Sequence, residues 1–239
     1  MKVILFGAGG QMGRAISALY EEDHPEVEVV LVDREESAYV SSMGGADVAI
    51  DFSGKEALGT ILSYCRENQV PLVIGTTGHE EKDLAEIEEA ARLIPIIKSG
   101  NYSLGVYVLK HLAREAARLL GEDADVEIIE KHHNRKKDAP SGTALLLADA
   151  VDAGGVPHER VYGREGVSPR KKGELGIHAV RGGSIVGEHT VLFALESESL
   201  ELVHRGESRM LFARGAVKAA QFIINQKPGL YAMDHMMKG

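Results

Sequence analysis

The chain has 239 residues, of which 44% are hydrophobic and 26% are charged, so it can fold as one large domain or two small ones with buried cores. Its formal net charge of −9 argues against nucleic acid as a partner, because phosphate binding needs a basic face. We find no signal-peptide pattern and no apolar run near the ~20 residues of a membrane span, which predicts a cytoplasmic protein.

The first hundred residues alternate short apolar runs with helical patterns. Cys65, the one cysteine, lies in such a helical pattern, which predicts a buried thiol and excludes an internal disulfide or a cysteine-based metal site. Strands this apolar, alternating with helices, indicate a parallel sheet covered on both faces. The predicted strands span 2–6, 27–33, 46–52, 71–78 and 94–99, and the predicted helices span 11–22, 55–68 and 80–93.

The pattern changes after residue 103. The sequence predicts helices over 103–121 and 141–151, a strand over 125–133, and a polar loop over 152–174. Three strand-like runs follow within 176–206, and Gly182-Gly183 predicts a tight hairpin between the first two. The helical pattern of 209–225 has the apolar spacing of a helix that packs on a sheet.

These elements predict an α/β protein of two domains. The first is a Rossmann-type parallel-sheet nucleotide domain built from 1–103 and 209–239. The second, 104–208, is an α+β domain with a mixed, partly open sheet of about four strands and two helices. Two helices leave one face of that sheet uncovered, and we expect another subunit rather than the first domain to cover it.

The glycine-rich segment 7–13, "GAGGQMG", follows a predicted strand and opens a helix, as a dinucleotide fingerprint does. The spacing departs from G-x-G-x-x-G, because Met12 stands at the third glycine and Gly13 comes one residue later. Asp33 ends the second strand, where a carboxylate either bonds the adenosine ribose or is simply solvated. Arg34 could pair with a 2′-phosphate, stack on adenine, or be solvated.

Two further turns, 75–78 and 99–103, follow the fourth and fifth predicted strands. Open α/β sheets bind ligands at these carboxyl ends, and small residues there let a nicotinamide ring approach the backbone. Either turn could also be purely structural.

Segment 130–144, "EKHHNRKKDAPSGTA", places two histidines beside a cluster of cations on an otherwise acidic chain. The side chains of His132 and His133 alternate along a strand, which disfavours one shared metal ion, and no cluster has metal-ligand spacing. One imidazole can donate a proton near neutral pH while the other contacts ligand or structure, or both can be loop residues. Repulsion among Arg135, Lys136 and Lys137 favours an anionic ligand.

The end of this segment predicts a helix start. Ser141 can cap the helix, and Gly142 and Thr143 present backbone N–H groups at the positive end of the helix dipole. Such a turn beside cations is suited to a carboxylate or a phosphate. A capped helix beside a solvated basic loop would explain each half separately.

The sequence resembles the dihydrodipicolinate reductase family over nearly its whole length. The resemblance rests on "GAGGQMGR", "VIGTTG", "NYSLGV", "IIEKHHNRKKDAPSGTA", "IVGEHTVLF", "SRMLFARGAV" and "GLYAMDHM". The segment between Asp33 and "DVAIDF" is shorter than in many members of the family. The resemblance implies NAD(P)H-dependent reduction of a cyclic dicarboxylate in lysine and diaminopimelate biosynthesis, no metal, and a homotetramer joined through its second-domain sheets.

The resemblance also implies roles for individual residues. His132 is expected to donate the proton, with Lys136 as an assisting cation. His133, Gly142 and Thr143 are expected to bind the substrate carboxylates, with Ser141 and Arg209 in support. The residues expected to hold the coenzyme are Gly7, Ala8, Gly9, Gly10, Gln11, Met12, Asp33, Arg34, Gly75, Thr76, Thr77, Ser99, Gly100, Asn101 and Tyr102.

Two rival functions share part of this pattern. A Rossmann dehydrogenase acting on another small acid would share the first half but would not need the His-His-Lys segment. A nucleotide-sensing module without catalysis would need neither His132 nor Lys136.

Overall fold

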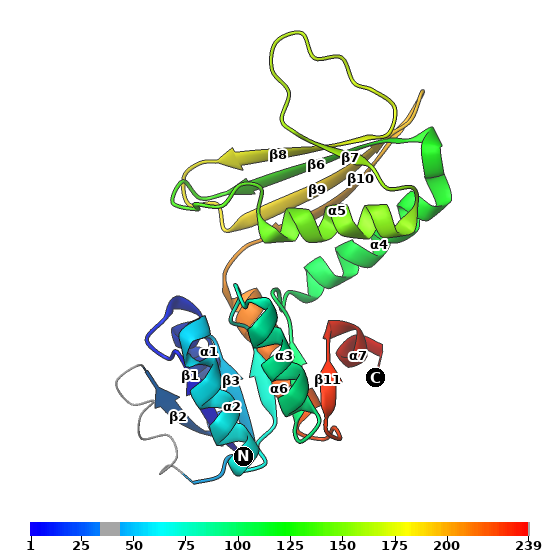
Figure 1. The fold of residues 1–239 in the computed structure, drawn as a ribbon. Coiled ribbons are helices and arrows are strands. Elements are labelled where there is room, and N and C mark those ends of the chain that lie inside the picture. Colours follow the sequence, from blue (N-terminus) through cyan, green and yellow to red (C-terminus); the bar gives the residue numbers. More distant parts are fainter. Residues whose placement is uncertain (34–43, 239) are drawn as a thin grey trace. The chain divides into compact units, whose positions relative to one another are not determined.

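The structure is a computed structural model that describes residues 1–33 and 44–238. The chain divides into two compact units, residues 1–103 together with 209–239, and residues 104–208 (Figure 1). Each helix in the described part of the chain is too short or too polar to cross a membrane.

The first unit is built on a parallel sheet of six strands in the order β11-β5-β4-β3-β1-β2. Its strands are β1 (Lys2–Phe6), β2 (Glu28–Val32), β3 (Val48–Asp51), β4 (Leu72–Ile74), β5 (Pro95–Lys98) and β11 (Gly229–Tyr231). Its helices are α1 (Gln11–Asp23), α2 (Leu58–Glu67), α3 (Glu81–Ala91), α6 (Met210–Ile223) and α7 (Met233–Lys238), with a 3₁₀ turn η2 (Lys55–Ala57).

Helices cover both faces of this sheet, as the uninterrupted apolar strands predicted. Helices α2 and α3 bury Ile61, Cys65 and Ile87 against alternate residues of the strands, such as Ile4 and Leu72. Helix α6 packs against α1 and against β3, β4 and β5. The strand order reverses between β1 and β3, and ligands of open parallel sheets bind outside the carboxyl ends at such a point.

The second unit contains a mixed five-stranded sheet in the order β10-β9-β6-β8-β7. Strand β6 pairs with β9 antiparallel and with β8 parallel. The strands are β6 (Asp125–His132), β7 (Glu159–Tyr162), β8 (Glu174–Arg181), β9 (Gly187–Ala194) and β10 (Ser199–Gly206). The helices are α4 (Leu104–Leu120) and α5 (Gly142–Gly154), with a 3₁₀ turn η3 (Gly121–Asp123).

Helices α4 and α5 lie together on one face of this sheet (Figure 1). Val126, Ile128, Glu130 and His132 of β6 are buried on this helix face, and the residues that alternate with them are half-buried or exposed. We call the opposite side of the sheet the outer face. The outer face carries the side chains of Ile129 on β6, Val180 on β8, Leu192 on β9 and Val203 on β10. No helix among the described residues of this unit packs on it.

Two sequence predictions about secondary structure were wrong, and one strand was not predicted. Gly182-Gly183 does not close a hairpin, because β6 is inserted between the two strands that the turn connects. The predicted loop 152–174 contains the end of α5 and strand β7, so the sheet has five strands rather than about four. Strand β11 was not predicted, because three residues paired only with β5 leave no alternation to read.

Candidate functional site

The glycine-rich turn lies at the point where the strand order of the first unit reverses. Gly7 has φ +77°, and a Cβ there would lie 2.5 Å from the carbonyl oxygen of Phe52. A Cβ on Gly13 would lie 2.2 Å from the carbonyl oxygen of Gly7. Gly13 therefore provides the close helix contact that the third glycine of the fingerprint usually provides, which accounts for the shifted spacing. Gly10 precedes α1 without a side-chain cap, so the first-turn N–H groups remain suited to an anion.

Asp33 links the end of β2 to this turn. Each of its carboxylate oxygens accepts a hydrogen bond of 3.0 Å from the backbone N–H of Gly9. The side chain is held beside the glycine-rich turn rather than pointing freely into solvent. Arg34 lies outside the described residues.

A pocket of about 270 Å³ opens beside the turn, within the first unit. It is lined by Gln11, Met12, Phe52, Gly75, Gly100, Asn101, Tyr102, Arg209 and Phe212. Six of these residues were predicted to hold the coenzyme, and they come from three segments that follow β1, β4 and β5. A Cβ on Gly75 would overlap the Phe52 ring at 2.3 Å, so glycine at this position lets the ring form the pocket wall.

The turn after β5 is fixed by its own hydrogen bonds. The Ser99 hydroxyl donates to the Asn101 carbonyl oxygen at 2.7 Å, and the Asn101 side chain accepts from the Ser103 N–H at 2.8 Å. The Tyr102 hydroxyl is buried against the carbonyl oxygens of Ile74 and Ile97, and burial raises its pKa. Tyr102 is thus a structural anchor as well as a pocket residue.

Other predicted coenzyme residues lie near the pocket without lining it. Ala8 and Thr76 are buried, whereas Gly9, Gly10 and Thr77 are exposed. The two buried residues shape the turns, and the three exposed residues present backbone groups to solvent.

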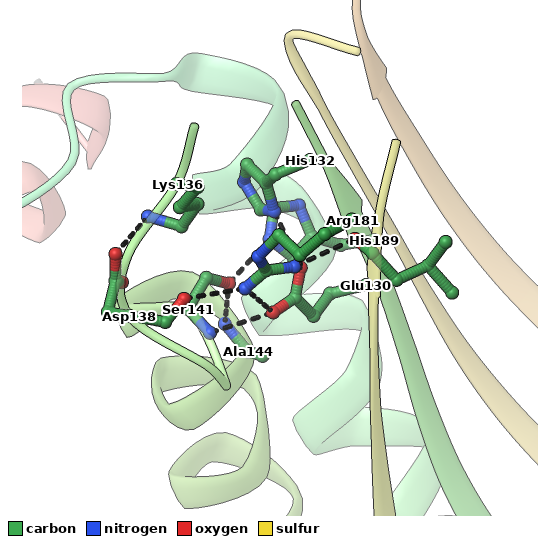
Figure 2. Close-up of polar contacts among 9 residues, drawn as sticks. Glu130, His132, Lys136, Asp138, Ser141, Ala144, Arg181 and His189 are labelled. Carbon is green, nitrogen blue, oxygen red and sulfur yellow. Dashed lines mark hydrogen bonds and ion pairs between the residues drawn. The ribbon is translucent and has the colours of Figure 1, made fainter. Parts of the chain in front are cut away.

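In the second unit, a buried carboxylate organises the histidine segment (Figure 2). Glu130 is fully buried on β6 and contacts three groups. Its carboxylate is 2.6 Å from His132 Nδ1, accepts the Ser141 N–H at 2.9 Å, and accepts two hydrogen bonds of 2.7 and 2.8 Å from Arg181. Because one carboxylate binds both, the His132 ring and the start of α5 lie side by side.

The hydrogen bonds determine the charge state of Glu130. Burial alone raises the pKa of the Glu130 carboxyl, but hydrogen bonds from His132, Arg181 and Ser141 outweigh burial and lower the pKa to about 2. A carboxylate only accepts hydrogen bonds, so His132 Nδ1 carries the hydrogen between them and Nε2 is left as the reactive nitrogen.

His189 of β9 closes the other side of this cluster. Its ring lies edge-on to the His132 ring at 5.2 Å, and its Nε2 is 3.2 Å from the Ser141 hydroxyl. Burial and the neighbouring His132 lower the pKa of His189 to about 4. His189 is therefore neutral at neutral pH and adds no second positive charge beside His132.

Ser141 caps α5 as the sequence predicted, with its hydroxyl accepting the Ala144 N–H at 3.2 Å. Its own N–H is already bound by Glu130. Gly142 comes next and is exposed, and a Cβ on it would meet no atom within 4 Å. The positive end of α5 therefore faces open space at Gly142, and the half-buried Thr143 follows it.

Lys136 lies in the same loop, half-buried, with its Nζ 2.9 Å from Asp138 Oδ1. Burial raises the pKa of Asp138, but the hydrogen bond from Lys136 outweighs it and the pKa is lowered. The sequence argument that the cations of this loop need an external anion was therefore too strong, because Asp138 already balances Lys136. A carboxylate ligand would have to compete with Asp138.

Two further residues, His133 and Arg209, were predicted to bind the substrate. His133 follows β6 and is half-buried. Arg209 belongs to the first unit, where it is exposed at the start of α6 and lines the pocket beside the glycine-rich turn.

A second cavity, of about 380 Å³, lies within the second unit at the opposite end of β6. Its lining includes Asp125, His158 and Arg170 but none of the residues predicted to bind substrate. Across residues 1–33 and 44–238, no group of three or more His, Cys, Asp or Glu side chains is arranged to hold a metal ion.

Sequence reasoning missed Glu130, Arg181, His189 and Phe52. Glu130 could have been noticed because it follows Val126 and Ile128 on the face of the strand that alternation marks as buried. Its partner Arg181 is 51 residues away, and no local pattern connects the two.

The chain is similar to known proteins over nearly its whole length. The family model described as "Dihydrodipicolinate reductase, N-terminus" matches residues 1–102, and "Dihydrodipicolinate reductase, C-terminus" matches residues 105–237. A 4-hydroxy-tetrahydrodipicolinate reductase of Caldanaerobacter subterraneus subsp. tengcongensis is 47% identical, covering 100% of this chain and 98% of the relative. The Clostridium tetani protein of the same name is 44% identical, covering 99% and 97%.

The fold is also found in solved structures. A dipicolinate-bound dihydrodipicolinate reductase from Paenisporosarcina sp. TG-14 superposes with a TM-score of 0.76 at 24% identity, covering 97% of each chain. A probable dehydrogenase from Thermotoga maritima gives a TM-score of 0.60 at 9% identity, covering 99% of this chain and 93% of that one. At these identities the similarity concerns the fold.

Proposed function

The chain belongs to the dihydrodipicolinate reductase family, and we propose that its two units carry out the family reaction with the residues described above. The reaction is the NAD(P)H-dependent reduction of 4-hydroxy-tetrahydrodipicolinate to tetrahydrodipicolinate in lysine and diaminopimelate biosynthesis. The chain is thus an oxidoreductase. We also propose that it works in the cytoplasm, where reduced nicotinamide coenzymes are produced.

The observation that carries the residue assignment is the single carboxylate of Glu130, which holds both the His132 ring and the start of α5. The His132 imidazole therefore lies next to an open helix N-terminus suited to a carboxylate. A dicarboxylate bound at Gly142 and Thr143, with Lys136 and His133 as further contacts, would place its ring beside His132. Ser141 would support this binding by capping α5.

The substrate loses its hydroxyl group and a hydrogen of the neighbouring carbon as water, which leaves a cyclic unsaturated dicarboxylate. A coenzyme bound in the first unit would supply a hydride to one carbon of the double bond. His132 gives the proton on Nε2 to the neighbouring carbon, and Lys136 stabilises the negative charge that develops before the proton arrives. One proton is consumed from solvent when His132 is reprotonated.

Residues of the first unit fit a dinucleotide. The closely packed Gly7 and Gly13 bring backbone N–H groups and the start of α1 to a pyrophosphate, and Asp33 stands at the strand end where the adenosine ribose is bound in such folds. The pocket between Met12, Gly75 and Tyr102 would take the nicotinamide.

An assay of coenzyme oxidation with the cyclic dicarboxylate tests the function as a whole. We expect oxidation of NADH and NADPH that depends on the dicarboxylate. A chain that binds coenzyme without oxidising it would instead be a nucleotide-sensing module, and one that oxidises it only with another acid would be a different dehydrogenase.

For the coenzyme, we expect use of both forms with a modest preference for NADH. The Asp33 carboxylate repels a 2′-phosphate and can bond a free ribose hydroxyl, whereas Arg34 offers the phosphate a cation. Asp33→Ala should raise the KM for NADH by about 10- to 100-fold, the effect of losing a hydrogen bond to a charged group. It should change the KM for NADPH less.

Steady-state kinetics with the two coenzymes on the same preparation check this result, because loosening of the Gly9 turn would affect both equally. Arg34→Ala should mainly harm the use of NADPH. A native protein that strongly prefers NADPH would contradict the role given to Asp33.

For the assembly, we propose a homotetramer in which the outer faces of the second-unit sheets pack on one another. This face presents the half-buried Leu192 and the exposed Val180 and Val203, and apolar side chains exposed on one face of a sheet mark an interaction surface. Sedimentation velocity should give the mass of four chains for the native protein.

A charged residue on that face should split the assembly. We expect Leu192→Glu to sediment as a smaller species and Leu93→Glu, at a 52% exposed leucine of the first unit, to remain tetrameric. A monomeric native protein would overturn the proposal.

A further inference from the structure

The cost of burying Glu130 calls for an explanation beyond fold stability. Its carboxylate is fully removed from solvent. Desolvating an ion in a protein costs several kcal/mol, and a pair of well-packed apolar residues is often as stable as a buried ion pair. Glu130 binds three partners, of which two belong to the proposed site, His132 and Ser141.

We propose that Glu130, held by Arg181, is a positioning residue for the reduction, which orients His132 as proton donor and fixes the carboxylate-binding start of α5 against it. The inference rests on the proposed function, since it specifies how that same site is assembled.

Glu130 orients the His132 ring. A hydrogen bond of 2.6 Å from Nδ1 fixes the orientation of the imidazole and leaves Nε2 to carry the transferable proton. The second ring nitrogen needs room, and Gly187 gives it, because a Cβ on Gly187 would lie 3.0 Å from Nε2. The ring is thus held on one side, and its other nitrogen faces a position where glycine leaves space.

Among the described residues, four charged or titratable groups face the His132 ring. The titratable and charged groups that face His132 are Glu130 on the same strand, Arg181 on β8, His189 on β9 and Lys136 in the loop. His189 is neutral, Arg181 is bound to Glu130, and Lys136 is bound to Asp138. The Glu130 carboxylate is therefore the negatively charged group that His132 contacts.

Ser141 connects Glu130 to the start of α5. Its N–H binds Glu130 at 2.9 Å, and its hydroxyl caps α5 through Ala144. Arg181 extends the same network, since it also donates to the Asp138 carbonyl oxygen at 2.6 Å. Glu130 and Arg181 thereby fix both ends of the segment that carries Lys136 and the start of α5.

The test is Glu130→Gln, which keeps the size of the side chain and removes its charge. We expect kcat to fall about 10- to 100-fold, by analogy with the loss of a partner that orients a metal-bound histidine. We also expect the high-pH limb of the kcat profile to move to lower pH, because His132 loses the negative charge that it contacts. A merely structural role would lower the amount of active protein without moving this limb.

Two further variants separate positioning from stability. Glu174→Gln removes a carboxylate that is buried at 6% exposure and bound to Arg164 at 2.8 Å, at the other end of the same sheet, and should leave kcat and the pH profile unchanged. Arg181→Gln keeps the Glu130–His132 hydrogen bond while removing the competing cation, so the limb should move to higher pH. If Glu130→Gln does not fold, Arg181→Gln decides, and a limb that stays in place overturns the inference.

A measurement without turnover completes the test. The ¹⁵N chemical shifts of the His132 imidazole should show a hydrogen on Nδ1 in the native protein and a changed shift of that nitrogen in Glu130→Gln. Native protein that reduces the dicarboxylate, paired with a Glu130→Gln variant of unchanged kcat and pH profile, would refute the positioning role alone. Native protein that does not reduce it would refute the proposed function, whatever the chemical shifts show.

Discussion

Replacement of His132 by glutamine should lower kcat by about 10²–10⁴-fold, the contribution typical of general acid catalysis. Glutamine keeps a polar side chain beside Glu130 but cannot deliver a proton at Nε2. The KM for the dicarboxylate should change much less, because the proton is transferred in the transition state and contributes little to ground-state binding. Steady-state kinetics at saturating coenzyme measure both constants.

The matched control for this variant is His158→Gln. His158 also binds a carboxylate through Nδ1, that of Asp152 at 2.9 Å, in the same unit but away from the segment 130–144. We expect this variant to keep the native kcat. A His132→Gln protein with near-native turnover would remove His132 from the role of proton donor.

Replacement of Lys136 by alanine should lower kcat/KM by about 10²–10³-fold, the effect of removing one group that stabilises developing negative charge. Both constants should change, because the ammonium group is expected to pair with a substrate carboxylate and also to stabilise the transition state. The loss of the 2.9 Å pair with Asp138 adds a free carboxylate to the loop, which repels the substrate further.

An inhibitor separates the effect of Lys136 on ligand binding from its effect on the transition state. Pyridine-2,6-dicarboxylate should compete with the substrate on the native protein and bind more weakly to Lys136→Ala. Lys172→Ala removes a lysine of the same unit that pairs with Glu122 at 2.7 Å outside the site, and should leave inhibition unchanged. If the planar dicarboxylate does not compete with the substrate, the anion-binding role of the α5 start is misassigned.

The nucleotide-binding fold could be predicted from the sequence because its signals are local. Strands such as Lys2–Phe6 are uninterrupted apolar runs, and the glycine-rich turn lies directly after the first of them. The role of Gly13 could not be assigned in the same way. Its contact with the carbonyl oxygen of Gly7 depends on how the helix returns over the turn, which the spacing alone does not specify.

The topology of the second unit required information that the sequence pattern lacks. The Gly182-Gly183 turn has the composition of a hairpin, but the stronger pairing of β6 with both neighbours separates the two strands that it joins. Strand pairing between residues more than 40 positions apart is decided by the packing of whole strands, whereas turn composition reports only local backbone preference.

The residues of the site also divide into those that local sequence predicts and those that depend on long-range contacts. The cap at Ser141 and the adjacency of His132 to the loop cations follow from neighbouring letters of the sequence. The Glu130–Arg181 pair and the contact of His189 with Ser141 join residues 51 and 48 positions apart. Long-range polar contacts of this kind arise because each buried charge or hydroxyl must find a partner, and which partner it finds is settled by the three-dimensional fold.

Isotope transfer tests the central claim most directly. The native protein is incubated in ordinary water with the cyclic dicarboxylate and with NADH that carries deuterium at both C4 positions of the nicotinamide. The mass of the product is then measured by mass spectrometry. We predict tetrahydrodipicolinate that carries one deuterium, formed in equal amount to the coenzyme oxidised. Unlabelled tetrahydrodipicolinate, or oxidation of the coenzyme without formation of this product, would contradict the proposed reduction.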